Sequence, residues 1–300
     1  MTNSSRICNF IDIDNVTATL RLFFSIPTFI FGLSSNILAL LVFCCFWKKQ
    51  NRTSVYMLNL AIADVLLLLS LPLKAYYSST EAPGLLCASI QFVYFINTYV
   101  SVFTIVCITV DRYICIKHPF KGRAHQSPKL AVCICIIIWA ITSACSSPMY
   151  LFYTEEHIKC FYNMSDEAWS SPLIASVEIF GFLIPLTVMV FCSAQNIWIL
   201  HNRKSQAGKK SESSLRVIIN LMVFLMCFTP VHLAIFLQCL VRRHVIVDCH
   251  LKQKISFFIQ VSMILANFNC CLDAIFYYFA AADFREKINL KRFLELCPIL

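Results

Sequence analysis

A few ionisable side chains interrupt the long apolar stretches of this sequence, and they are the residues that could do chemistry. They are Asp64 and Lys74, the triplet Asp111-Arg112-Tyr113, Glu178, His232 and Asp273. Charge within apolar surroundings is costly, so each is a candidate functional group. Where carboxyl groups meet in a low-dielectric interior they need a bound cation or a shared proton, and a buried lysine attracts an anion.

These residues do not predict an enzyme. The sequence has no HExxH or GxSxG motif and no Cys/His pair at a suitable depth, so it offers no nucleophile with an adjacent base. Cys249 and His250 have no second pair of ligands at zinc spacing. We therefore expect no catalytic residue, no cofactor and no metal beyond a sodium ion.

The apolar stretches that position these residues are long enough to cross a bilayer. Of the 300 residues, 59% are hydrophobic, the mean hydropathy is +0.71, and about 20 apolar residues span a membrane as a helix. The runs are continuous and lack the alternation of a barrel strand. We expect an all-α membrane protein, a seven-transmembrane helix bundle, with spans at Leu22–Trp47, Val55–Tyr77, Leu85–Ile116, Leu130–Phe152, Leu173–Leu200, Leu215–Val241 and Ile255–Ala281.

Basic residues in the loops predict the orientation of this bundle. Lys and Arg of the first, third and fifth connections and of the tail all fall on one side, which is the cytoplasmic side. The amino terminus, residues 1–21, is then extracellular, and no cleaved signal peptide is evident. Positive loops account for most of the net charge of +9, so nothing calls for a nucleic-acid partner. Three glycosylation acceptors fall outside: Asn3, Asn15 and Asn163.

Four of the 17 cysteines lie in the oxidising outer segments: Cys8, Cys87, Cys160 and Cys249. Four cysteines allow three pairings. Most of the others lie within the apolar stretches, where free cysteine behaves as a small apolar residue.

Seven motifs occur in order along nearly the whole chain. They are Asn36, the run from Asn59 to Asp64, Asp111-Arg112-Tyr113, Trp139, Pro185, Cys227-Phe-Thr-Pro230 and Asp273-Ala-Ile-Phe-Tyr277. In this order they resemble the signature of rhodopsin-like (class A) G-protein-coupled receptors. Within that family, Asn269-Cys-Cys-Leu-Asp273 and Pro230-Val-His232 are similar to the receptors for lysophosphatidylinositol and kynurenic acid, and the phrase from Cys160 to Trp169 resembles the former more closely.

The resemblance implies roles for particular residues. Residues 22–281 would form the receptor domain, located in the plasma membrane and coupled to heterotrimeric G proteins of the alpha-12/13 or alpha-q class. Disulfides would join Cys87 to Cys160 and Cys8 to Cys249, and Arg112 would pair with Asp111 at rest. The coupling and activation residues would be Asp111, Arg112, Tyr113, Phe228, Pro230 and Tyr277, and the sodium pocket would comprise Asp64, Ser101, Asn269 and Asp273, where proton sharing without sodium is the alternative.

Three departures from the family pattern concern activation. Ala274 replaces a proline, so the kink there is in doubt. Phe228 replaces a tryptophan, and Lys210 stands where many relatives have an acid that bridges to the arginine of the third helix. Without that bridge, basal activity is expected to rise unless other contacts hold the inner ends closed.

The ligand pocket is expected to be cationic and aromatic. The third helix has no carboxylate in its outer half, and the seventh has no lysine, so a biogenic amine and a retinal Schiff base are both unsuitable. Lys74 would instead bind an anionic head group, which suits a lysophospholipid. The candidate ligand-binding residues are Lys74, Tyr94, Phe95, Glu178, His232, Phe236, Arg242 and Arg243. Helix-end anchoring is the alternative for Lys74, and solvated loops for Arg242 and Arg243.

The remaining expectations concern the tail and competing functions. Residues 282–300 have the pattern of a cytoplasmic amphipathic helix on the inner leaflet, where Cys297 is a candidate for acylation. Residues 263–300 contain no Ser or Thr, so phosphorylation is expected at Ser205, Ser211, Ser213 and Ser214, with weak arrestin binding. Competing functions are a receptor for a small organic anion or a nucleotide, and a small-solute transporter, although no repeat or polar path favours transport.

Overall fold

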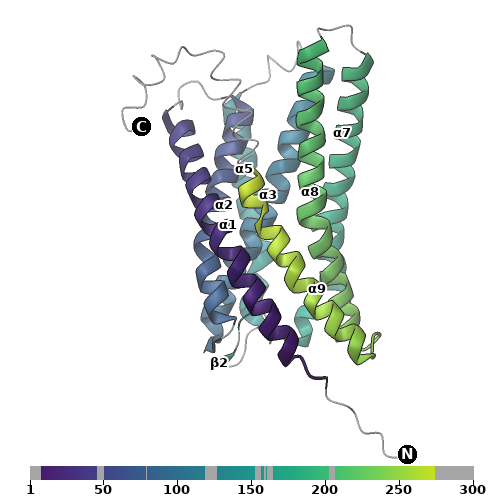
Figure 1. The fold of residues 1–300 in the computed structure, drawn as a ribbon. Coiled ribbons are helices and arrows are strands. Elements are labelled where there is room, and N and C mark those ends of the chain that lie inside the picture. Colours follow the sequence, from purple (N-terminus) through teal and green to yellow (C-terminus); the bar gives the residue numbers. More distant parts are fainter. Residues whose placement is uncertain are drawn as a thin grey trace, which may run out of the picture.

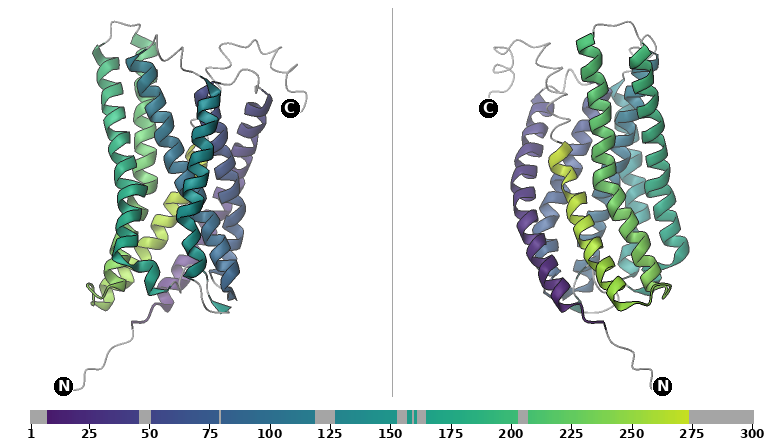
Figure 2. Two further views of the ribbon diagram at one scale, coloured as in Figure 1. Left: turned by 180° about the vertical axis from the view of Figure 1, so that it is seen from behind. Right: turned by 45° about the vertical axis from the view of Figure 1, so that its right-hand side comes forward.

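The computed structural model describes residues 8–45, 51–78, 80–118, 127–152, 157–158, 160, 165–202 and 207–273. Within these ranges, seven helical segments are long and apolar enough to span a membrane. They run alternately up and down and pack side by side as one bundle (Figure 1, Figure 2). This confirms the predicted seven-helix bundle.

The first four spans lie close to the expected positions. Their elements are α1 (Ile11–Cys45), α2 (Arg52–Tyr77), α3 (Gly84–Lys117), and α5 (Pro128–Ser146), which continues as the 3-10 turn η2 (Ser147–Leu151). A short antiparallel pair, β1 (Ala82–Pro83) with β2 (His157–Ile158), lies before α3.

The last three spans include two irregular points. The fifth span consists of α6 (Ser171–Glu178), a π-helical stretch, η4 (Ile179–Leu183), and α7 (Ile184–Asn202). A 3-10 turn, η3 (Asp166–Trp169), precedes α6. The sixth span is α8 (Ala207–Arg242), and the seventh begins with α9 (Cys249–Asn267). After α9, Phe268 interrupts the helix, which resumes at Asn269 and is described to Asp273. The interruption thus falls before Ala274, the position where the family proline is missing.

The first, sixth and seventh helices begin well before their predicted starts, and α8 does so at Ala207 rather than Leu215. The first span begins at Ile11 rather than Leu22, with the Ile11 amide donating to Asn9 Oδ1 at 3.0 Å; the acceptor Asn15 therefore lies within α1. The seventh begins near Asp248, whose carboxylate accepts from the Leu251 amide at 2.8 Å. The sequence analysis ended each predicted span at charged residues. A charged residue can nevertheless lie inside a helix when polar partners surround it.

Buried polar side chains join the helices across the bundle. Asn59 of α2 donates to Thr104 Oγ1 of α3 and accepts from Trp139 Nε1 of α5, both at 2.8 Å. Asn36 of α1 donates to the Cys270 carbonyl at 2.9 Å. Large apolar side chains such as Phe23 lie on the outside of the bundle. Polar contacts inside and apolar side chains outside suit a bundle surrounded by lipid.

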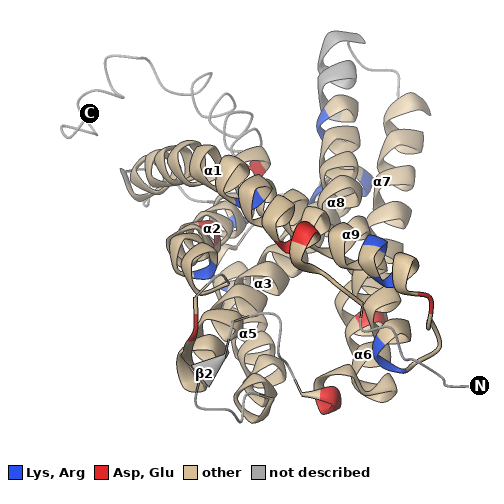
Figure 3. Ribbon diagram, turned by 60° about the horizontal axis from the view of Figure 1, so that its bottom comes forward, with Lys and Arg blue, Asp and Glu red and all other residues tan. Residues whose placement is uncertain are grey.

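The structure contains both expected disulfides, Cys87–Cys160 and Cys8–Cys249. They lie at one end of the bundle, called here the disulfide end, and Arg112 lies towards the opposite end, called the Arg112 end. Figure 3 views the bundle from the disulfide end, with basic residues in blue and acidic residues in red. The Cys8–Cys249 disulfide joins the segment before α1 to the start of α9. The Cys87–Cys160 disulfide joins the start of α3 to the loop that contains Cys160.

Candidate functional site

Lys74 lies in the last turn of α2 at the disulfide end, and the bundle buries it. Its side chain is 6% exposed. Its ammonium nitrogen lies 3.5 Å from the centre of the Tyr94 ring on α3 and 3.6 Å from Met263 Sδ on α9. A cation over an aromatic face is attracted by the ring quadrupole. The side chain therefore points into the bundle and does not extend along the helix end, as simple anchoring would require.

A second cation, Arg21 of α1, lines the same pocket, and the sequence analysis missed it. Its guanidinium is buried and donates to Ser78 Oγ and, at 3.2 Å, to Gln260 Oε1 of α9. Arg21 is close enough to Lys74 for their charges to interact. The pocket thus lies between α1, α2 and α9, and its lining comprises Arg21, Ser25, Leu71, Lys74, Ala75, Gln260, Met263, Ile264 and Asn267.

The other expected ligand residues divide into those near Lys74 and those apart from it. Tyr94 is 4% exposed and meets Phe95 edge to face at 5.8 Å. Phe236 is 49% exposed on α8. Arg242 contacts the exposed Asp166 at 3.9 Å, and Arg243 donates to Ser171 at 3.3 Å. None of these last three is among the described residues that line the Lys74 pocket.

Glu178 and His232 form a separate buried pair between α6 and α8. His232 Nδ1 lies 3.3 Å from Glu178 Oε2, and His232 is 2% exposed. The His232 ring stacks on Phe182 at 4.5 Å and meets the Tyr99 ring edge to face at 6.0 Å. Glu178 thus pairs with His232, whereas the Lys74 contacts described above are to α3 and α9.

The π-helical stretch η4 follows Glu178 directly and brings Gly181 against Tyr99. A Cβ atom at Gly181 would lie 2.7 Å from Tyr99 Cε1, closer than real contacts allow. Single π-helical turns are frequent at functional sites. Here the glycine permits the close approach of α3 that places Tyr99 beside His232.

Gly181→Ala is expected to lower the free energy of unfolding by about 1–3 kcal/mol, because the stiff Tyr99 ring must move. Gly32→Ala is the matched control, since its Cβ would meet the flexible methyl ends of Leu68 at 2.9 Å. Thermal denaturation of both purified variants measures the difference. A melting temperature that falls equally in both would contradict the account of Gly181.

Two buried carboxyl groups, Asp64 of α2 and Asp273, interact directly in the middle of the bundle. Both are fully buried, and Ser101 of α3 is 3% exposed. Asn269 Nδ2 donates to Asp273 Oδ2 at 2.7 Å. Two carboxyl groups in contact must share a proton or a cation. The structure therefore places all four expected sodium-pocket residues in the buried interior and shows direct contacts for three of them.

Three oxygens of this region are suited to a cation. Asp273 Oδ1, Asn269 Oδ1 and Asn97 Oδ1 are buried and have no hydrogen-bond partner among the described atoms. Asn97 lies one turn before Ser101 on α3, so the two share a face of that helix. The sequence analysis missed Asn97, although its four-residue spacing from Ser101 was a signal for it.

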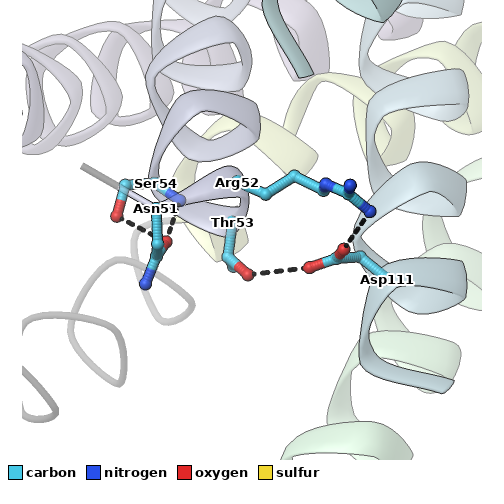
Figure 4. Close-up of polar contacts among 5 residues, drawn as sticks. All are labelled: Asn51, Arg52, Thr53, Ser54 and Asp111. Carbon is cyan, nitrogen blue, oxygen red and sulfur yellow. Dashed lines mark hydrogen bonds and ion pairs between the residues drawn. The ribbon is translucent and has the colours of Figure 1, made fainter. Parts of the chain in front are cut away.

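At the Arg112 end, Asp111 of α3 is bound by the first turn of α2. Arg52 Nη1 lies 3.2 Å from Asp111 Oδ1, and Thr53 Oγ1 donates to Asp111 Oδ2 at 3.1 Å (Figure 4). Both members of the ion pair are buried. Asn51 begins this turn by accepting from the Ser54 amide at 2.8 Å, which fixes where α2 starts. The expectation that Asp111 pairs with Arg112 at rest omitted this contact with α2.

The other expected activation residues that the structure describes lie on α3 and α8. The ring centroids of Tyr113 and Phe191 of α7 lie 6.1 Å apart, and the Tyr113 hydroxyl accepts a hydrogen bond from Lys117 Nζ at 2.7 Å. Phe228 is 1% exposed, and its ring centroid lies 5.2 Å from that of Phe224, one turn earlier on α8. Pro230 also lies within α8. Several expectations lie outside the described residues or side chains: Asn3, Asn163, Ser205, Lys210, Ser211, Ser213, Tyr277 and the tail with Cys297.

Comparison with known proteins assigns the family. The model of the 7 transmembrane receptor (rhodopsin family) matches residues 35–277. The chain is 43% identical to G-protein coupled receptor 55 of Mus musculus over 303 residues, covering 95% of this chain and 93% of that protein. It is 33% identical to G-protein coupled receptor 35 (86% and 83% covered) and 30% identical to lysophosphatidic acid receptor 6 (88% and 81% covered), both also from Mus musculus.

The family match covers the end of the first span and the other six spans as far as they are described, with Lys74, the buried carboxyl pair and the Arg52–Asp111 ion pair; Arg21 lies before it. It identifies a multi-pass receptor of the plasma membrane that signals through heterotrimeric G proteins, and not an enzyme. The chain belongs to the rhodopsin family of seven-transmembrane G-protein-coupled receptors.

Proposed function

We propose that this receptor responds to an anionic lysophospholipid whose head group binds at Lys74. One observation carries the proposal: a buried lysine at the disulfide end points into a pocket between three helices and lies over Tyr94. In such a buried, low-dielectric pocket the attraction between the ammonium group and an anion is screened only weakly. An anionic head group is therefore a favourable ligand there. Apolar lining such as Leu71 and Ile264 suits the first methylene groups of an acyl chain.

The comparisons supply the lipid part of the proposal. The chain shares 30% identity with a receptor that is named for lysophosphatidic acid, and its motifs resemble the receptor for lysophosphatidylinositol. Both ligands combine an anionic phosphate with one acyl chain. The proposed ligand class has the same two features, a head group for Lys74 and a chain for the apolar lining.

The proposal includes an orientation and a partner class. The disulfide end faces outwards with the amino terminus extracellular, because cysteines pair in oxidising compartments. The Arg112 end then faces a G protein of the alpha-12/13 or alpha-q class. Arrestin binding is weak in this scheme, because the proposed phosphorylation sites are confined to residues 205–214, of which Ser211, Ser213 and Ser214 belong to the start of α8.

Nucleotide exchange tests the proposed function. The receptor in lipid nanodiscs is mixed with G protein, and exchange is followed with lysophosphatidylinositol, lysophosphatidic acid, kynurenic acid or a nucleotide. Stimulation by one or both lipids is expected. Stimulation by an organic anion or a nucleotide alone would replace the lipid with that class. Uptake of solute into proteoliposomes without nucleotide exchange would favour a transporter.

We also propose that the Asp64 and Asp273 site binds sodium. The support is the set of buried oxygens without partners on Asp273, Asn269 and Asn97. Sodium should raise the melting temperature of the purified receptor above its value in potassium at equal ionic strength, and Asp273→Asn should remove that difference. Equal stability in the two salts would leave a shared proton as the account of the carboxyl pair.

A further inference from the structure

A hydrogen bond joins α8 to α3 close to Arg112. Asn220 Nδ2 of α8 donates to Thr109 Oγ1 of α3 at 2.7 Å. Thr109 is 3% exposed and precedes Arg112 by about one turn of α3. This contact between two spans therefore lies beside the residue to which the family resemblance assigns coupling.

The direction of this bond is fixed by the other contact of Thr109. The Thr109 hydroxyl donates its hydrogen to the Ile105 carbonyl of its own helix at 3.0 Å. A hydroxyl has one hydrogen and two lone pairs, so Thr109 Oγ1 accepts from any further partner. The side-chain amide of Asn220 supplies the matching donor. The bond thus needs an amide on α8 and a hydroxyl on α3, and an apolar side chain at either position removes it.

Apolar packing between α3 and α8 surrounds this bond. Ile105 of α3 and Phe224 of α8 belong to one buried apolar cluster. Such contacts are non-directional, so they tolerate small shifts of one helix against the other. In addition, α8 contacts α9 and α7 more extensively than it contacts α3. The Asn220–Thr109 bond therefore supplies a directional contact that sets the distance between α3 and α8 at this level.

A bend in α8 would act on this bond through a long lever. Pro230 lies inside α8, about 15 Å along the helix from Asn220. Proline removes a helical hydrogen bond and permits a bend at its position. A bend of about 10° at Pro230 would move Asn220 by about 2.5 Å. Directed away from α3, this movement breaks the bond, because hydrogen bonds weaken steeply beyond about 3.2 Å.

Polar atoms of α7 at the same level have no partner in this packing. The Phe191 ring lies beside Tyr113, which follows Arg112 directly. Within the next two turns of α7, Ser193 Oγ and both amide atoms of Asn196 are buried without a hydrogen-bond partner among the described atoms. Such atoms are costly, so an arrangement of the helices that hydrates or pairs them competes with the present one. One hydrogen bond can then shift the balance between two arrangements.

We propose that the Asn220–Thr109 bond holds the receptor in its inactive arrangement, and that its loss allows the Arg112 end to open towards the G protein. Asn220 and Thr109 are positioning residues in this role, since they act through the position of α8. The sequence favours such a contact, because Lys210 of α8 and Arg112 carry the same charge and do not pair. The inference rests on the orientation proposed above and not on the identity of the ligand.

Thr109→Val tests the inference, because valine has a similar shape and lacks the acceptor. Nucleotide exchange is measured without ligand, with G proteins of both proposed classes, at equal amounts of folded receptor in lipid nanodiscs. Basal exchange should rise about two- to tenfold, as the loss of one net hydrogen bond predicts. Asn220→Leu should produce the same rise. The double variant should rise no further than either single variant, because both substitutions remove one contact.

Thr104→Val is the matched control, because the same pair of groups joins α3 to α2 there. Thr104 Oγ1 accepts from Asn59 Nδ2 at 2.8 Å and donates to the Val100 carbonyl at 2.6 Å. The substitution removes a hydrogen bond of the same kind from the same helix without involving α8. It should lower the melting temperature as Thr109→Val does and leave basal exchange unchanged. Thr109→Ser keeps the hydroxyl and should stay close to the wild type.

Two results would overturn the inference. One is basal exchange equal to that of the wild type in Thr109→Val and Asn220→Leu, and the other is an equal rise in Thr104→Val. Each of the two single variants removes the bond, so the test stands if one of them fails to fold. The assay contains no added lipid ligand, so a failure of the lysophospholipid proposal leaves its result intact.

Discussion

Lys74→Ala is expected to reduce the potency of an anionic lysophospholipid at least about thirtyfold, because the phosphate loses a buried charge partner. Removing most buried charges also destabilises a protein. Lys74 differs, because Arg21 is a neighbour of like charge and two of its contacts, the Tyr94 ring face and the Met263 thioether, can be lost at small cost. Surface expression of the alanine variant should therefore persist.

Lys74→Arg provides the matched comparison, since it keeps the charge at the same position on α2 and should retain part of the response. Concentration–response curves for nucleotide exchange, normalised to surface receptor, measure both variants. An alanine variant whose curve overlays the wild type would show that Lys74 anchors the end of α2 and does not bind the head group.

Arg52→Ala is expected to produce the largest loss of stability. It leaves the carboxylate of Asp111 buried with the Thr53 hydroxyl, and breaking a buried ion pair in this way costs about 3–5 kcal/mol. The side chains of the pair are only 10% and 6% exposed. The melting temperature of the purified receptor should fall by several degrees. Basal nucleotide exchange should rise, because Asp111 loses its tie to α2 beside Arg112.

Two further variants distinguish the effect of the ion pair on stability from the effect of losing any positive charge. Lys129→Ala removes a positive charge from the exposed start of α5 and should cost about 0–1 kcal/mol. Arg52→Ala combined with Asp111→Asn should be more stable than Arg52→Ala alone, because no buried charge is left behind. If Arg52→Ala were as stable as Lys129→Ala, the ion pair would have no structural importance.

The helices and the disulfides could be predicted from the sequence because their signals are local or few. Seven apolar runs are long enough to span a bilayer, and four outer cysteines allow three pairings, among which the resemblance to the family indicated one. Lys74, Asp64 and Asp273 were also identifiable, since each is a charge within an apolar run. The contacts of these residues were not identifiable, because they come from helices far apart in the sequence.

Arg21 and Arg52 show why part of the site was missed. Both stand at an end of a predicted span, and a charge in that position normally marks the boundary with water. In the structure both lie inside helices and are buried, Arg21 by polar partners on α2 and α9 and Arg52 by Asp111 on α3. Only the packing of the helices distinguishes these residues from solvated ones such as Lys254.

Gly181 and Asn97 were missed for a different reason. A glycine in an apolar run gives no sign that the helix widens there, and η4 depends on how the fifth span packs against Tyr99. Asn97 has a helical spacing from Ser101, but several polar residues lie on α3, and the burial and unpartnered oxygen of Asn97 are what mark it in the structure. Backbone irregularities and unsatisfied atoms arise from tertiary packing.

The most direct test is an experimental structure of the receptor with a bound lysophospholipid. The account predicts a phosphate oxygen about 2.7–2.9 Å from Lys74 Nζ, the distance of a charge-assisted hydrogen bond, with the acyl chain along the apolar lining between α1, α2 and α9. A phosphate held by Arg242 and Arg243, with the Lys74 side chain still against the Tyr94 ring, would contradict it.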